Sequence, residues 1–273
     1  MTSIEAVVLG VVQGVTEFLP ISSTAHLRIV PEALGWSDPG AAFTAVLQLG
    51  TLAAVLLFFA KDLLAMLKGT VAALTNPARR RDPEARLLVS LIIGTVPVVI
   101  AGVLFKKAIT GEWRALTVIA SAMIVVAIGL AVVERVAKHE RTFDQITLRD
   151  ALIIGAAQAL ALVPGVSRSG ITLLAAMAIG LRRDAAARFS FLLSIPAIAG
   201  AGVFEMKHVL HAHESKTPLL IGTAVAAVTG YASIAWLLKF LRTRTTMPFV
   251  VYRILVGALI LALVLSGTWR NGV

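Results

Sequence analysis

The chain has no cysteine among its 273 residues, and only 15% of its residues are charged. Without cysteine it has no disulfide, thiolate metal site or catalytic thiol, and redox chemistry says nothing about the compartment. Acidic residues are also scarce, with 15 Asp and Glu against 25 Lys and Arg. A soluble domain of this length cannot hide 58% hydrophobic residues, and the mean hydropathy is +0.89. The composition therefore predicts one lipid-embedded helical domain over residues 1–273.

Six segments are apolar over about 20 residues, the length that a helix needs to cross a bilayer. They cover about 41–60, 88–105, 115–134, 187–205, 218–240 and 248–267. Two further apolar stretches, about 4–30 and 150–180, are interrupted near their middle by proline, glycine and hydroxyl residues. Because lipid cannot satisfy the backbone at such a break, each stretch is predicted to be a re-entrant helix–loop–helix hairpin. The predicted fold is an all-α polytopic membrane protein.

Basic residues concentrate in four connections, 61–86, 135–149, 182–188 and 239–244. If the six spans alternate in direction and both hairpins return, these connections share one side of the membrane. The positive-inside rule predicts that this side is cytoplasmic. Both termini and the first hairpin then face outward. The net charge of +10 is explained by topology, so no nucleic-acid partner is expected.

The two halves of the chain, about 1–140 and 141–273, resemble each other weakly. Gly10-Val-Val-Gln13 recurs as Gly155-Ala-Ala-Gln158, and the proline–serine break recurs in each hairpin. Each half contains one hairpin and three spans. Because three is odd, the second half is predicted to be inverted relative to the first, with both hairpin tips near the membrane midplane.

Polar residues gather at the first break. Gln13 and Glu17 are spaced i, i+4 and project from one helix face, and a carboxylate inside a membrane is costly unless it is paired or functional. Ser22, Ser23 and Thr24 follow the proline and suit a helix N-cap. His26 lies three residues beyond Ser23, one helical turn on.

The second break contains an arginine and three hydroxyl residues on a proline–glycine turn that is expected to open a helix. They are Ser167, Arg168, Ser169, Gly170 and Thr172. Helix N-termini and glycine turns offer converging backbone N–H groups to an anion. Arginine adds a planar fork for phosphate.

The combined set suits phosphoryl transfer. Arg168 would clamp the oxyanion, Ser23 would be the nucleophile, and His26 or Glu17 the acid and base. The predicted substrate-binding residues are Gln13, Ser22, Thr24, Ser167, Ser169, Gly170 and Thr172. A divalent cation, Mg²⁺ or Ca²⁺, is expected to bridge Glu17 and diphosphate oxygens.

Each of these residues also has a purely structural interpretation. The serines would cap helices, and Glu17 would form a salt bridge with Arg168. Arg253, near the start of the last predicted span, is expected to extend to the membrane surface, with a contact to substrate as the alternative.

Two segments, Gln13–His26 and Pro164–Gly170, resemble the two signatures of the bacterial undecaprenyl-diphosphate phosphatases, also called bacitracin-resistance proteins. The resemblance extends over essentially the whole chain. It implies removal of the terminal phosphate of undecaprenyl diphosphate at the outer side of the cytoplasmic (inner) membrane. That reaction recycles the lipid carrier for peptidoglycan and other cell-wall polymers and confers bacitracin resistance. A divalent cation, an inverted-repeat fold and a homodimer are also implied.

By position, Glu17 matches the family's acidic residue, Ser23 its proposed nucleophile, His26 its histidine and Arg168 its phosphate-binding arginine. Gln13 stands where some members have glutamate, so the first signature carries one carboxylate here, and Gln13 cannot act as a base.

The alternative function is a transporter or flippase of polyprenyl phosphates, because inverted repeats and broken helices are also transporter features. Transport of a polyprenyl phosphate would require Arg168, but it would require neither Ser23 nor His26, because it needs no pair of nucleophile and base.

Overall fold

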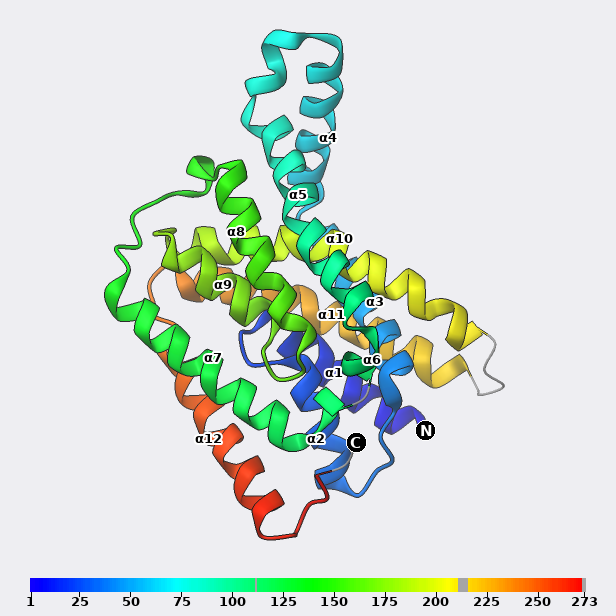
Figure 1. Ribbon diagram of the computed structural model, residues 1–273. Coiled ribbons are helices and arrows are strands. Elements are labelled where there is room, and N and C mark those ends of the chain that lie inside the picture. The colour runs from blue at the N-terminus through cyan, green and yellow to red at the C-terminus, as the bar shows by residue number, and fades with distance from the viewer. Residues whose placement is uncertain (111, 211–215, 272–273) are drawn as a thin grey trace.

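The computed structural model describes residues 1–110, 112–210 and 216–271, which are helical without a strand apart from one isolated bridge between Arg141 and Leu181 (Figure 1). The α-helices are α1 (Ser3–Phe18), α2 (Ser23–Leu34), α3 (Gly40–Phe58), α4 (Ala60–Thr75), α5 (Pro83–Leu104), α6 (Lys106–Thr110), α7 (Leu116–Val136), α8 (Leu148–Ala159), α9 (Arg168–Ala178), α10 (Arg183–Leu210), α11 (Lys216–Leu241) and α12 (Met247–Leu265). Short 3₁₀ helices are η1 (Pro77–Arg81), η2 (Glu112–Arg114), η3 (Phe143–Gln145) and η4 (Leu160–Leu162).

Helices long and apolar enough to cross a membrane occupy the predicted spans. Within the described part of the chain there are five: α5, α7, Arg183–Gly202 of α10, Thr217–Leu241 of α11, and α12. Together, α3 and α4 form a sixth candidate, which bends by 71°. Their outer faces carry exposed aliphatic side chains such as Val103, Val125 and Leu255, as lipid contact requires. The chain is therefore a multi-pass membrane protein.

The connection after the first predicted span is more ordered than its charges indicate. Helix α4 occupies residues 60–75 and packs along α5, and the two project from the body of the molecule (Figure 1). The sequence of α4 explains its conformation, since leucine, alanine and lysine are good helix formers. The bend lies at Phe59, whose backbone leaves the helical region.

Both predicted hairpins are present, as α1–α2 and as α8–α9. Helix α1 begins with a capping box between Thr2 and Glu5 and ends two residues before Pro20. At the tips, Ser22 and Ser167 are the N-caps of α2 and α9, and each has a positive φ, 78° and 71°. Each hydroxyl accepts from the backbone N–H three residues on. Non-glycine residues persist in such conformations where the surrounding structure enforces them, often at functional sites.

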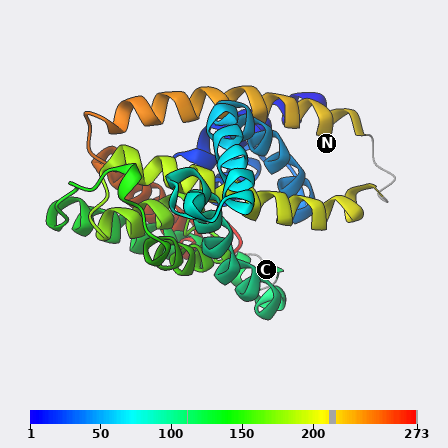
Figure 2. The same cartoon turned by 90° about the horizontal axis from the view of Figure 1, so that it is seen from above.

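Equivalent helices of the two halves make equivalent contacts. Helix α1 packs along α11, whereas α8 packs along α5, so each hairpin is held by a helix from the other half. In each pair two glycines let the backbones touch: Gly10 meets Gly222, and Gly155 meets Gly94. Helices α7 and α12 pack against each other, as do α3 and α10. Figure 2 shows the bundle from above, with α11 in orange and gold along its upper edge. A two-fold repeat predicts such matching contacts between the two halves. The division near residue 140 stays a prediction.

Candidate active site

The tips of the two hairpins meet inside the bundle. Ser169 Oγ of the second hairpin donates to the carbonyl of Leu19 at 3.0 Å, and the Gly165 N–H points to Thr24 Oγ1 at 3.4 Å. Residues about 150 positions apart in sequence thus form one site, as the broken helices predict.

Glu17 lies at the centre of this site and is 6% exposed. Its Oε1 forms an ion pair with Arg168 Nη2 at 3.0 Å. Its Oε2 accepts from Ser23 Oγ at 2.6 Å and from Gln13 Nε2 at 3.1 Å. The predicted carboxylate, nucleophile and arginine therefore form one continuous chain of contacts. A serine that donates to a buried carboxylate has the geometry of a nucleophile with its base.

His26 lies one turn away with different partners. Its Nδ1 is 2.7 Å from the Ser22 carbonyl and must donate there, so Nε2 accepts from the Tyr252 hydroxyl at 2.6 Å. Among the described contacts no hydrogen bond joins His26 to Ser23. Of the two candidate bases, Glu17 is the one in contact with the serine, and His26 instead fixes the backbone that carries it.

Two buried polar atoms in the site have no hydrogen-bond partner within the described residues: Gln13 Oε1 and Arg168 Nε. Arg168 also donates from Nη1 to the Ser190 carbonyl at 3.2 Å, so its guanidinium is held from two directions. An orphaned donor and an orphaned acceptor on either side of one carboxylate are unusual, since buried polar groups normally find partners. They provide a free donor for a phosphate oxygen and a free acceptor for a cation or water.

The other predicted substrate-binding residues take part in the framework of the tips. Ser22 Oγ contacts Thr24 Oγ1 at 3.1 Å. Ser167 Oγ accepts from the Gly170 N–H at 3.1 Å. Thr172 Oγ1 donates to the Arg168 carbonyl at 2.7 Å. Their structural role is visible, and their role in binding substrate stays a prediction.

Arg253 is the main residue that the sequence analysis misjudged. The expectation that it extends to the membrane surface is wrong, because its side chain is fully buried. The guanidinium donates to carbonyls of both tips and of α7: Pro20 at 3.1 Å, Gly165 at 2.9 Å, Val166 at 3.1 Å, Met123 at 3.0 Å and Ala122 at 3.4 Å. Helices broken at the tips leave carbonyls without partners, and the five donors of a guanidinium can satisfy them.

Tyr252, the neighbour of Arg253, was also missed as a site residue. It is one of only two tyrosines, and its ring stacks on His26 with centroids 5.6 Å apart. The available sequence signal was a Tyr-Arg pair inside an otherwise apolar helix.

A cavity of about 290 Å³ reaches the tips and is lined by Thr24 and Pro164 from the hairpins. Its wall also includes Arg28 and Arg114, both within 3.6 Å of Asp38. Among the tip residues, Thr24 and Pro164 line this cavity, and Glu17, Ser23 and Arg168 do not.

The fold and the site define a polytopic membrane protein with a serine–carboxylate–arginine site between two hairpin tips. Residues 6–259 match the model of the bacitracin resistance protein BacA family, and the chain belongs to this family.

Among curated relatives, the chain is 55% identical to an undecaprenyl-diphosphatase of Myxococcus xanthus (strain DK1622), over 98% of this chain and 91% of that protein. It is 50% identical to an undecaprenyl-diphosphatase of Synechococcus elongatus, over 98% and 95% of the two chains. It is 48% identical to an undecaprenyl-diphosphatase of a Nocardioides species, over 97% of both.

Proposed function

We propose that this protein hydrolyses undecaprenyl diphosphate to undecaprenyl phosphate and phosphate, recycles the lipid carrier for cell-wall synthesis and confers bacitracin resistance. The observation that carries the proposal is the chain Ser23–Glu17–Arg168, in which a nucleophile, a base and a phosphate ligand are in direct contact. The names of the relatives supply the substrate.

In the proposed reaction, Arg168 binds the terminal phosphate, with its free Nε and the N–H groups at the start of α9. Ser23 Oγ attacks the terminal phosphorus, and Glu17 takes the hydroxyl proton. The bond from phosphorus to the bridging oxygen breaks, and undecaprenyl phosphate leaves with the electron pair. Glu17 passes this proton to the departing phosphate group. Water then attacks the phosphoserine, Glu17 takes a proton from the water and returns it to Ser23 Oγ, and phosphate is released.

His26 is assigned as a positioning residue in this scheme. Its Nδ1–H holds the Ser22 carbonyl, and so fixes the peptide that precedes the nucleophile. Proton transfer through His26 Nε2 and Tyr252 is the alternative role. The pH dependence of the rate separates these two roles of His26. A histidine that transfers protons adds its own pKa to the pH–rate profile, whereas a positioning histidine changes the rate without adding one.

A divalent cation fits the donors of this site. Mg²⁺ is commonly held by one or two protein oxygens together with substrate phosphates. Glu17 and the unpartnered Gln13 Oε1 are the two protein oxygens here. When bound, the ion would neutralise charge on the diphosphate. No group of three or more His, Asp or Glu side chains suited to a metal occurs among the described residues, so the substrate would complete the coordination.

The site is proposed to open to the outer side of the inner membrane. The cavity at the tips is lined by Arg28 and Arg114, which the sequence analysis assigns to the side that is poorer in basic residues, and the basic connections are predicted to share the other side. The positive-inside rule supports this orientation.

The test is phosphate release from a long-chain prenyl diphosphate by the purified protein in detergent, with and without chelator. Ser23→Ala, Glu17→Gln and Arg168→Gln are each expected to lose most of the activity. Ser233→Ala is the matched control, since among the described contacts that buried hydroxyl bonds only the Thr229 carbonyl. Retained activity in Ser23→Ala would reject the serine nucleophile. Lipid binding without any release, whatever metal is supplied, would instead favour the transporter.

A further inference from the structure

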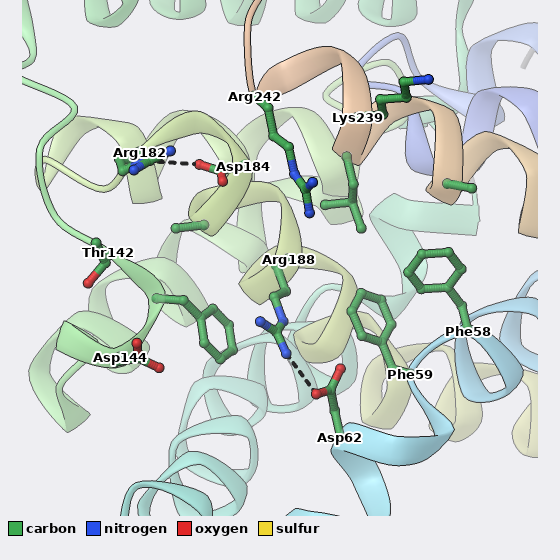
Figure 3. Close-up of a pocket in the computed structure, with 14 residues that line it drawn as sticks. Phe58, Phe59, Asp62, Thr142, Asp144, Arg182, Asp184, Arg188, Lys239 and Arg242 are labelled. Carbon is green, nitrogen blue, oxygen red and sulfur yellow. Dashed lines mark hydrogen bonds and ion pairs between the residues drawn. The ribbon is translucent and has the colours of Figure 1, made fainter.

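A cavity of about 620 Å³ lies outside the candidate active site (Figure 3). Its walls come from the α3–α4 junction, the segment around η3, the start of α10 and the end of α11. None of the predicted catalytic residues lines it. Phe59 on its wall and Phe18, which precedes the tip and follows Glu17 in the sequence, belong to one apolar core cluster.

The cavity is lined by more positive than negative side chains. Four are basic and three acidic, which gives a net charge of +1: Arg182, Arg188, Lys239 and Arg242 against Asp62, Asp144 and Asp184. Two of the arginines have carboxylate partners, Asp184 at 3.3 Å and Asp62 at 2.7 Å. Within the described residues, Arg242 and Lys239 form no side-chain hydrogen bond or ion pair.

Two guanidinium groups from different helices face the same space. Figure 3 shows the Arg242 side chain extending from the end of α11 into the cavity, toward Arg188 of α10. Arg188 is held in place by Asp62 and lies over the Phe143 ring, 4.4 Å from its centroid. Asp144 lies to the left of Arg188 and below Thr142 in this view. Asp62 compensates the charge of Arg188, whereas Arg242 has no counter-ion among the described residues, so an anion between the two guanidinium groups would be attracted to this space.

We propose that this cavity binds a phosphate group, the head of a lipid phosphate monoester or free inorganic phosphate, between Arg242 and Arg188. Two guanidinium forks match the several oxygens of one phosphate. The volume is within the range of small-molecule sites. Phe58, Phe59 and Leu238 supply an apolar wall at the ends of α3 and α11, beside which a lipid chain can lie. The site is on the basic side of the fold and is separate from the catalytic one.

The test measures binding in an Arg168→Gln background, which weakens phosphate binding at the catalytic tips. The probes are radiolabelled inorganic phosphate, by equilibrium dialysis, and a short-chain prenyl monophosphate in nanodiscs of zwitterionic lipid. Arg242→Gln is compared with Arg244→Gln, an equally exposed arginine two residues on that does not line the cavity. Thermal unfolding in detergent verifies that each variant is folded. A further variant, Arg242→Lys, keeps the positive charge but lacks the planar guanidinium group.

Arg242→Gln is expected to weaken binding about ten- to hundredfold, the effect of one charged hydrogen bond or more. Arg244→Gln should stay within about twofold of its parent, and Arg242→Lys should lie between. If Arg242→Gln weakens the binding of both probes, the cavity is a general phosphate site. If it weakens the binding of the prenyl monophosphate alone, the cavity is a site for a lipid head group. Equal binding by Arg242→Gln and Arg244→Gln with both probes would overturn the proposal. Because binding is measured without hydrolysis, this result is independent of the proposed catalytic function.

Discussion

Arg253→Met removes the only side chain in the described residues that donates to both hairpin tips. In the native protein its guanidinium reaches the carbonyls of Pro20, Gly165 and Val166 at 2.9–3.1 Å. Methionine keeps much of the volume but supplies no donor. The carbonyls then remain buried without their charged partner.

The magnitude follows from these three carbonyls. At about 1 kcal/mol each, the low end of the cost of an unsatisfied buried acceptor, Arg253→Met should lose about 3 kcal/mol of stability. The catalytic effect is separate, because a displacement of about 1 Å in a reacting group costs about 100-fold in rate. Release of the Pro20 carbonyl moves the backbone that carries Ser23. We therefore expect kcat to fall about 100-fold, with a smaller change in KM.

The assay combines thermal unfolding in detergent with phosphate release at saturating prenyl diphosphate. Arg253→Lys should fall between wild type and Arg253→Met, because one ammonium cannot reach both tips as a planar fork does. Arg244→Met, an exposed arginine, serves as the control. If Arg253→Met keeps kcat and unfolding temperature close to those of Arg244→Met, the tips do not depend on this residue and the reasoning is refuted.

Three further predictions concern the framework. Glu134→Gln should lower the free energy of unfolding by about 2 kcal/mol, because the Glu134 carboxylate accepts from Arg183 of α10 and from Thr246 at the start of α12. An unchanged unfolding temperature would contradict this prediction. Gly165→Ala should reduce phosphate release more than tenfold, because φ at Gly165 is +93° and a Cβ there would overlap the Ile119 carbonyl. The control Gly35→Ala, at φ +68° in open space, should cost only about 1 kcal/mol of backbone strain. Equal effects of the two substitutions on phosphate release would refute the steric argument. Burial raises the pKa of Asp150, but hydrogen bonds from Arg141 and the start of α8 outweigh it and hold the pKa below its usual value. The stabilisation by Asp150 is therefore present above about pH 4 and lost as pH falls further, and Asp150→Asn should flatten this acid dependence of unfolding.

The spans and the two breaks were predictable from sequence because lipid imposes simple rules. A span needs a continuous apolar helix, and a proline–serine or proline–glycine break inside one has to be buried in protein. Those rules place Glu17, Ser23 and Arg168 near one another before any coordinates are seen. The contacts among them in the structure agree with that placement.

What the sequence did not reveal depends on rotation and packing. Arg253 lies seven residues into the helix that begins at Met247, a position from which its side chain can extend to the membrane surface or turn inward. The packing of α12 on α7 decides between these directions. The same packing brings Tyr252 to His26, more than 200 residues away. The bend at Phe59 was missed because the charges after it indicated a polar connection rather than a second helix.

The cross-packing of the hairpins has a consequence for the order in which the protein is assembled during synthesis. Helix α1 reaches its native surroundings only after α11, whose sequence begins at Lys216, has left the ribosome and entered the membrane. Glu17 also lacks its arginine until the second half is made, because Arg168 belongs to that half. The first hairpin must therefore wait for most of the polypeptide, either near the membrane surface or beside an insertion factor that shields its polar face. A chain truncated before α11 should leave this hairpin accessible to proteases, even though all of its own residues have been made.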